Sequence, residues 1–283
     1  MAEPARKPVT VALRVGVFVV LGIAIQMFLA QALLWIGGPP WYLVASVFSV
    51  FAAAAAANAV VMRIYERGRL TDAGFAWNAA ARRHLALGLG GGAGAAVVVL
   101  GAPLAAGGAQ LVAAPRGDAS PLFVLVLLLF GAAGEEMLFH GYGFQLLLAV
   151  LGPWATILPA SVLFAWAHSS NLNVTWLALA NTAGWGILLG YAFWRSGDLW
   201  LPIGLHVGWN WTLPLAGANL SGFTMNLTGY EIHFRLPALW SGGEYGPEGG
   251  LLTSLVLLAV LAGLWKAPVR RQHPLLLKAR WEA

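Results

Sequence analysis

Long runs of apolar residues, separated by short polar breaks, extend along almost the whole chain. A helix of about 20 apolar residues crosses the hydrocarbon core of a membrane, and this length predicts about eight membrane-spanning helices. The breaks between them, such as GGPP, APRGDASP and RSGD, are rich in residues that favour turns. The pattern therefore predicts an all-α, polytopic membrane protein. The predicted spans are Val9 to Ile36, Trp41 to Met62, Leu85 to Ala113, Pro121 to Leu151, Pro153 to His168, Val174 to Trp194, Leu199 to Leu215 and Leu251 to Lys266.

The composition supports this fold class. The chain of 283 residues is 59% hydrophobic and 10% charged, whereas about a quarter of the residues of a soluble domain are charged. It contains no cysteine, which excludes disulfide bonds, thiolate catalysis and cysteine-ligated zinc. The first predicted span is too long for a secretory signal peptide, so we expect it to be retained as a membrane helix.

The basic residues are unevenly divided between the predicted loops. With a cytoplasmic N-terminus, 14 of the 16 lysine and arginine residues fall on the cytoplasmic side, and Arg116 and Arg235 fall on the other. This bias is typical of cytoplasmic loops, and it predicts eight spans with both termini in the cytoplasm. Membrane topology thus explains the net charge of +5, and we expect no nucleic-acid partner. The 14 residues are Arg6, Lys7, Arg14, Arg63, Arg67, Arg69, Arg82, Arg83, Arg195, Lys266, Arg270, Arg271, Lys278 and Arg280.

Three segments follow from this organisation. Residues 1–120 would form the N-terminal membrane helices, residues 121–215 a core that contains the candidate catalytic residues described below, and residues 216–283 an outer loop, the last membrane helix and a basic cytoplasmic tail. The stretch GLGGGA at residues 88–93 has the spacing of a dinucleotide-binding fingerprint, but no strand precedes it. Close helix packing through small residues is the better interpretation. The absence of an evident internal repeat disfavours an inverted-repeat transporter.

Two adjacent glutamates, Glu135 and Glu136, lie deep inside the fourth predicted span. Ionisable residues within a membrane helix are costly and usually functional. Neighbouring residues on a helix point about 100° apart, so the two carboxylates should have different roles. Glu136 and His140 are four residues apart and share a helix face, which allows a hydrogen bond between them. Glu135 is then free to face elsewhere.

Two later spans contribute polar residues of their own. His168 ends the stretch FAWAH, with Phe164 one turn before it, and HVGWN places His206 and Asn210 on one helix face. A carboxylate and an imidazole can deprotonate a water molecule, and an imidazole and an amide can stabilise an oxyanion. This set suits hydrolysis of an acyl bond, such as a peptide bond, in an intramembrane cavity.

A second chemistry is open to the same residues. Glu135, His168 and His206 would also form a His₂Glu set for one divalent metal such as zinc. The chain has neither an H-E-x-x-H nor a G-x-S-x-G motif. The sequence does not separate a metal-activated water from a glutamate-activated one.

The other intramembrane or ionisable side chains receive structural assignments. Asn58 and Asn181 are expected to form hydrogen bonds to neighbouring helices. His84, His233 and His273 are placed in loops or tails.

The three motifs resemble those of the CPBP family of intramembrane proteases, which includes the type II CAAX prenyl endopeptidases and bacterial immunity-type relatives. The family pattern is E-E-x-x-x-R, F-x-x-x-H and H-x-x-x-N on successive membrane helices. The chain has EEMLFH, FAWAH and HVGWN within roughly residues 121–215. The resemblance implies that Glu135 activates water with help from His168. It also implies that His206 and Asn210 stabilise the oxyanion.

The supporting positions contain one departure from the family. The resemblance gives Glu136 and Phe164 supporting roles, and His140 stands where the family usually has arginine. Arginine can bind a carboxylate through two hydrogen bonds, whereas a histidine forms at most one strong bond to Glu136. We therefore expect His140→Arg to retain or raise activity.

These observations predict an intramembrane endopeptidase that acts on a hydrophobic or lipid-modified peptide in the lipid bilayer. The composition is typical of a bacterial inner-membrane protein, and bacteria generally lack prenylated CAAX proteins, so the substrate is left open. Two alternatives are a non-catalytic membrane binding or bacteriocin-immunity protein on the same fold and a proton-coupled transporter. The four residues assigned to catalysis favour the peptidase, because a binding protein needs none of them.

Overall fold

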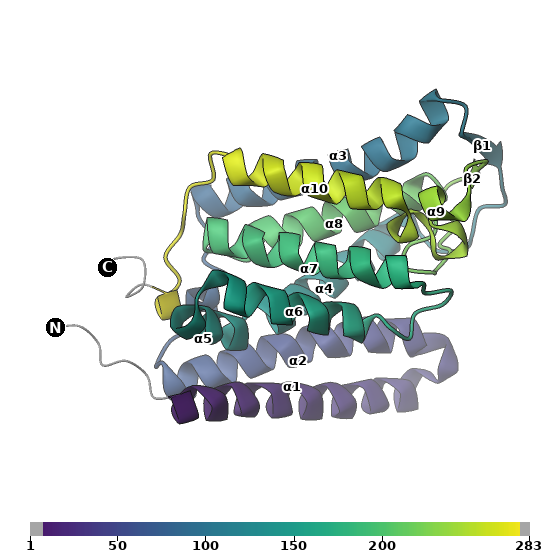
Figure 1. The fold of residues 1–283 in the computed structure, drawn as a ribbon. Helices are drawn as coiled ribbons and strands as arrows, with labels where there is room; N and C mark the ends of the chain where they lie inside the picture. Colours follow the sequence, from purple (N-terminus) through teal and green to yellow (C-terminus); the bar gives the residue numbers. More distant parts are fainter. Residues whose placement is uncertain (1–7, 278–283) are drawn as a thin grey trace.

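The computed structural model describes residues 8–277, which form a helical bundle with a small β-ribbon at one end (Figure 1). Strands β1 (Ala109–Ala113) and β2 (Tyr230–Phe234) pair antiparallel, with Ala109 opposite Phe234. The helices are α1 (Pro8–Gly37), α2 (Tyr42–Tyr65), α3 (Ala79–Ala105), α4 (Pro121–His140), α5 (Tyr142–Leu151), α6 (Pro153–Ala167), α7 (Trp176–Ser196), α8 (Trp200–Leu215), α9 (Ala238–Ser241) and α10 (Leu251–Lys266). Single 3-10 turns cover Pro39–Trp41, Leu70–Ala73, Gly243–Tyr245, Pro247–Gly249 and Leu275–Leu277.

The long helices lie side by side, and the chain passes repeatedly from one end of the bundle to the other (Figure 1). The beginning of α1 and the end of α10 lie at one end, whereas β1, β2 and α9 lie together at the opposite end. We call residues 216–250, which include β2 and α9, the cap. Arg63, Arg82, Arg195 and Lys266 are in helix turns at the end away from the cap. These basic residues therefore lie at one end of the bundle, as the uneven distribution of charge in the sequence predicts. Arg6, Lys7, Lys278 and Arg280 lie outside the described residues.

Within residues 8–277, four helical stretches are long and apolar enough to cross a membrane. Two shorter apolar helices, Pro153–Ala167 and Leu251–Lys266, fall below the usual length. The protein is thus mostly helical, with several candidate membrane spans. Helix length and composition alone do not establish the eight spans predicted from the sequence. The four are Pro8–Gly37, Pro39–Tyr65, Ala79–Ala105 and Pro121–Leu151.

Two predicted spans differ in the structure. The span predicted from Leu85 to Ala113 begins earlier, at Ala79, where the side chain of Asn78 caps the helix, and it ends at Ala105. The apolar residues that follow form β1, because a short apolar run fits a strand as well as a helix. The prediction of an all-α fold is therefore wrong in this detail. The span predicted from Pro121 to Leu151 consists of two helices, α4 and α5, which are separated at Gly141.

Glycine brings α3 and α8 into backbone contact. A Cβ atom added to Gly88 or Gly92 would collide with backbone carbonyls of α8, and one added to Gly204 or Gly208 would collide with carbonyls of α3. Small residues allow helices to approach this closely, and the packing interpretation of GLGGGA is confirmed. Because α8 carries His206 and Asn210, this contact fixes the helix that presents them. The carbonyls concerned belong to Leu201 and Leu205 of α8 and to Leu85 and Leu89 of α3.

The contact gives a prediction with an internal control. We expect Gly92→Leu to destabilise the protein by about 1 to 3 kcal/mol, because the new side chain must push α8 away from α3. Gly90→Leu should not lower the stability, since no atom lies within 4 Å of a Cβ at that position and leucine favours a helix more than glycine does. Thermal melting of both variants in detergent tests the expectation, and equal melting temperatures would contradict it.

Candidate active site

The buried carboxylate of Glu136 connects three parts of the site. Its side chain has no solvent exposure. Oε2 accepts a hydrogen bond from Nδ1 of His140 at 2.7 Å, and Oε1 accepts one from Nδ1 of His206 at 2.9 Å. The predicted bond to His140 is confirmed. The bond to His206, which lies 70 residues further along the chain, is new, and it ties α8 to α4.

Glu135 points towards two imidazoles. Its Oε2 lies 3.8 Å from Nε2 of His168 and 3.9 Å from Nε2 of His206. The side chain is 31% exposed, yet Oε2 itself is buried and has no hydrogen-bond partner among the described residues. A buried carboxylate oxygen without a donor is unusual. Oε2 therefore lies between two ring nitrogens with no donor of its own among the described residues.

A hydrogen bond at Nδ1 orients the imidazole of His168 and that of His206. Nδ1 of His168 lies 2.8 Å from the carbonyl oxygen of Phe164, and Nδ1 of His206 faces the carboxylate of Glu136. Because these partners only accept hydrogen bonds, each Nδ1 must carry a proton, an assignment that follows from the network. Each Nε2 is therefore turned towards Glu135. Such support fixes the orientation of an imidazole.

The metal alternative is tested by the same distances. Two ligands of a tetrahedral zinc ion lie about 3.3 to 3.5 Å apart, because each bond is about 2.0 to 2.1 Å long. The two Oε2 to Nε2 distances are longer, whereas a water molecule with bonds of about 2.8 Å to both atoms can span them. Within residues 8–277, no group of three or more His, Cys, Asp or Glu side chains is arranged to hold a metal. These distances fit a bridging water better than a bound zinc ion, so the metal set stays a prediction, and no step proposed below requires it.

Phe164 and Asn210 complete the residues expected from the sequence. The ring of Phe164 lies 4.7 Å from the ring of His168 and 6.2 Å from that of His206, and it packs edge-on against Phe139. It therefore forms an apolar wall beside both imidazoles. Asn210 is partly buried on α8, one turn after His206, and makes no hydrogen bond to the described residues. Its role stays a prediction.

Asn58 supports the helix that carries both glutamates. Its Nδ2 donates hydrogen bonds to the carbonyls of Ala54 and Met137, and its Oδ1 accepts one from the backbone N–H of Tyr142. The Met137 carbonyl and the Tyr142 N–H lose their helical partners where α4 ends at Gly141. The expected structural role of Asn58 is confirmed. That of Asn181 is confirmed as well, since its Nδ2 donates to the carbonyls of Glu248 and Gly250.

The sequence pattern does not reveal a second buried pair. It places His84 in a loop, which is wrong, because His84 lies in α3 and is 1% exposed. Its Nδ1 lies 2.6 Å from Oδ2 of Asp198, whose Oδ1 accepts from the backbone N–H groups of Trp200 and Leu201. Asp198 thus caps α8, the helix of His206. An aspartate just before an apolar helix is a capping signal, but nothing in the sequence indicated its partner 114 residues away.

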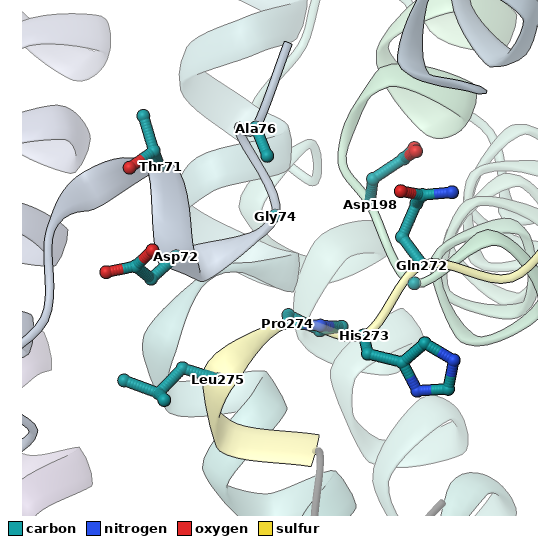
Figure 2. Close-up of a pocket in the computed structure, with 10 residues that line it drawn as sticks. Thr71, Asp72, Gly74, Ala76, Asp198, Gln272, His273, Pro274 and Leu275 are labelled. Carbon is teal, nitrogen blue, oxygen red and sulfur yellow. The ribbon is translucent and has the colours of Figure 1, made fainter. Parts of the chain in front are cut away.

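A cavity of about 130 Å³ lies where the α2–α3 connection, the α7–α8 turn and the segment after α10 meet (Figure 2). Asp72, Asp198 and His273 are among the residues that line it. The carboxylates of Asp72 and Asp198 point in different directions and do not converge on one ligand (Figure 2). None of the predicted site residues lines this cavity. It is therefore not the catalytic cavity expected from the sequence.

Residues 117–212 match the family model described as type II CAAX prenyl endopeptidase Rce1-like. This segment is similar to an Rce1-like domain. The resemblance found in the sequence is confirmed. The segment contains the site residues Glu135, Glu136, His140, His168, His206 and Asn210. The comparisons with curated proteins and with solved structures gave no match. An Rce1-like domain implies a protease, and together with the four long apolar helices it indicates an integral membrane protein.

Substitutions of His140 test whether the site tolerates the arginine that the family pattern has at this position. We expect His140→Arg to retain or raise peptide cleavage, because a guanidinium can donate to Oε2 of Glu136 as Nδ1 does now. His140→Leu, which offers no donor, should lose activity. Cleavage rates of the purified variants check this. An inactive but well-folded His140→Arg protein would mean that the site depends on the imidazole itself.

Proposed function

We propose that the chain is an intramembrane endopeptidase that hydrolyses a peptide bond with a water molecule activated by Glu135. The observation that carries this proposal is the buried Oε2 of Glu135, which lies without a donor between the Nε2 atoms of His168 and His206. A water molecule between these three atoms would lose a proton easily, because a carboxylate and an oriented imidazole both accept one. The Rce1-like domain supports the same reaction class.

The reaction would proceed by two proton transfers. Glu135, assisted by His168, takes a proton from water, and the water oxygen bonds to the carbonyl carbon of the substrate. In its imidazolium form His206 keeps its Nδ1 bond to Glu136 and donates Nε2–H to the oxyanion. The side-chain amide of Asn210 would donate a second bond. When the carbon–nitrogen bond breaks, protonated Glu135 returns its proton to the leaving amine.

The substrate would be a hydrophobic or lipid-modified peptide that reaches the site from the bilayer. The aromatic wall of Phe164 and the partial exposure of Glu135 support an apolar, accessible site. The proposal places the chain in a bacterial inner membrane with eight spans and both termini in the cytoplasm. The gathering of basic residues at the end of the bundle away from the cap supports this orientation.

Proteoliposomes that contain the purified protein test the proposal. A panel of membrane-anchored hydrophobic peptides, with and without a prenyl group, is incubated with them, and products are identified by mass spectrometry. We expect cleavage at defined bonds. Tight peptide binding without cleavage would instead support a binding or immunity protein. Proton flux, measured with a pH-sensitive dye, would support a transporter if cleavage is absent.

A further inference from the structure

The cap contains a buried carboxylate whose position is tied to the active site. Glu248 lies in the 3-10 turn Pro247–Gly249 and is 8% exposed, although the sequence places it in an outer loop. Resting on the proposed function, we propose that Glu248 is a positioning residue, which holds the turn of α8 that presents His206 and Asn210.

Three donors hold the carboxylate of Glu248. Oε1 accepts a hydrogen bond from the indole Nε1 of Trp209 at 3.0 Å. Oε2 accepts one from the backbone N–H of Ser221 at 2.5 Å and one from its hydroxyl at 2.9 Å. Bonds to an ionised acceptor are about twice as strong as those between neutral groups. The carboxylate therefore joins the cap to α8 firmly.

Trp209 transmits this support to the site. It follows His206 by three residues and directly precedes Asn210 on the same helix. Its ring also packs 4.8 Å from the ring of Trp185 on α7. The indole is thus held by α7 and by the carboxylate of Glu248. Rotation of this part of α8 would break one or both contacts.

The same carboxylate also connects the cap to the chain beyond His168. Gly222, the neighbour of Ser221, has a φ of 86°, and a Cβ atom added to it would collide with the backbone carbonyl of Leu172. Leu172 follows His168 by four residues. Glu248 is further anchored by its own carbonyl, which accepts from Asn181 of α7. Glu248 therefore bonds to α8 directly, and it reaches the segment after His168 only through Ser221 and its neighbour Gly222.

Glu248→Gln tests the proposal in the full-length protein. The amide oxygen can still accept from Trp209, but the amide nitrogen cannot accept from the backbone N–H of Ser221. We expect kcat for peptide cleavage to fall roughly tenfold, with KM within about twofold of the original value. Glu244→Gln is the matched control, because Glu244 lies in the same cap, is exposed and donates or accepts nothing through its carboxylate among the described residues. This control should leave both constants unchanged.

Trp209→Phe supplies an independent arm, because it removes the indole N–H and keeps a ring against Trp185. It should lower kcat as Glu248→Gln does, and the double variant should be no slower than the slower single variant. Additive losses of kcat in the double variant, or an unchanged kcat in Trp209→Phe, would overturn the proposal. If Glu248→Gln does not fold, the kcat of Trp209→Phe tests the proposal by itself. Full activity of Glu135→Gln would instead overturn the proposed function, so the two failures are distinguishable.

Discussion

Glu135→Gln is expected to abolish peptide cleavage and to leave the fold intact. The substitution keeps the size of the side chain and removes the group that takes the proton from water. A general base contributes roughly 10² to 10⁴-fold to such a reaction, so the rate should fall by about 10³-fold. Stability should not fall, because Oε2 of Glu135 has no hydrogen-bond partner among the described residues that the change could remove.

The measurement is a cleavage assay on proteoliposomes, combined with thermal melting in detergent. Glu231→Gln is the control, since Glu231 lies in the cap on β2 and is 43% exposed, where it pairs with His233. It should cleave at the original rate. Normal cleavage by Glu135→Gln would show that another group activates the water.

Glu136→Leu should have a different effect, although the two residues are neighbours. Removal of this carboxylate leaves the Nδ1–H groups of His140 and His206 buried without an acceptor. Loss of one partner from a buried charged network costs about 3 to 5 kcal/mol, so both stability and activity should be lost. Glu136→Gln keeps one acceptor oxygen and should be intermediate in stability.

Comparison of the variants at Glu135 and Glu136 separates effects on the cleavage rate from effects on stability. Melting temperatures should follow the order Glu135→Gln, Glu136→Gln, Glu136→Leu, from highest to lowest, whereas cleavage should already be lost in the first. If Glu136→Leu melted at the temperature of the unchanged protein, the network around Glu136 would carry no structural role, contrary to our interpretation.

The parts of the site that the sequence could predict depend on local spacing. The bond between Glu136 and His140 follows from four residues on one helix, and the different roles of Glu135 and Glu136 follow from their 100° separation. The bond from Glu136 to His206 spans 70 residues, and its existence depends on how α4 and α8 pack. The spacing of residues along one helix does not predict how two separate helices pack.

The fold shows the same limit. Apolar runs located the helices closely, and α10 matches its predicted bounds from Leu251 to Lys266. They did not distinguish β1 from the end of α3, because a run of five residues satisfies either structure. The burial of His84 and Glu248 was also missed, since each is polar and lies beside a predicted break. Only the arrangement of α3, α8 and the cap encloses them.

The interruption at Gly141 has a consequence for how the chain enters the bilayer. It falls within an apolar stretch of 31 residues, where an unsatisfied carbonyl or amide costs several kcal/mol in contact with lipid. The side chain that satisfies these groups, Asn58, belongs to α2, which leaves the ribosome before α4 does. The hairpin of α1 and α2 can therefore insert into the membrane first. When α4 and α5 pack against it, Asn58 satisfies the polar backbone groups beside Gly141.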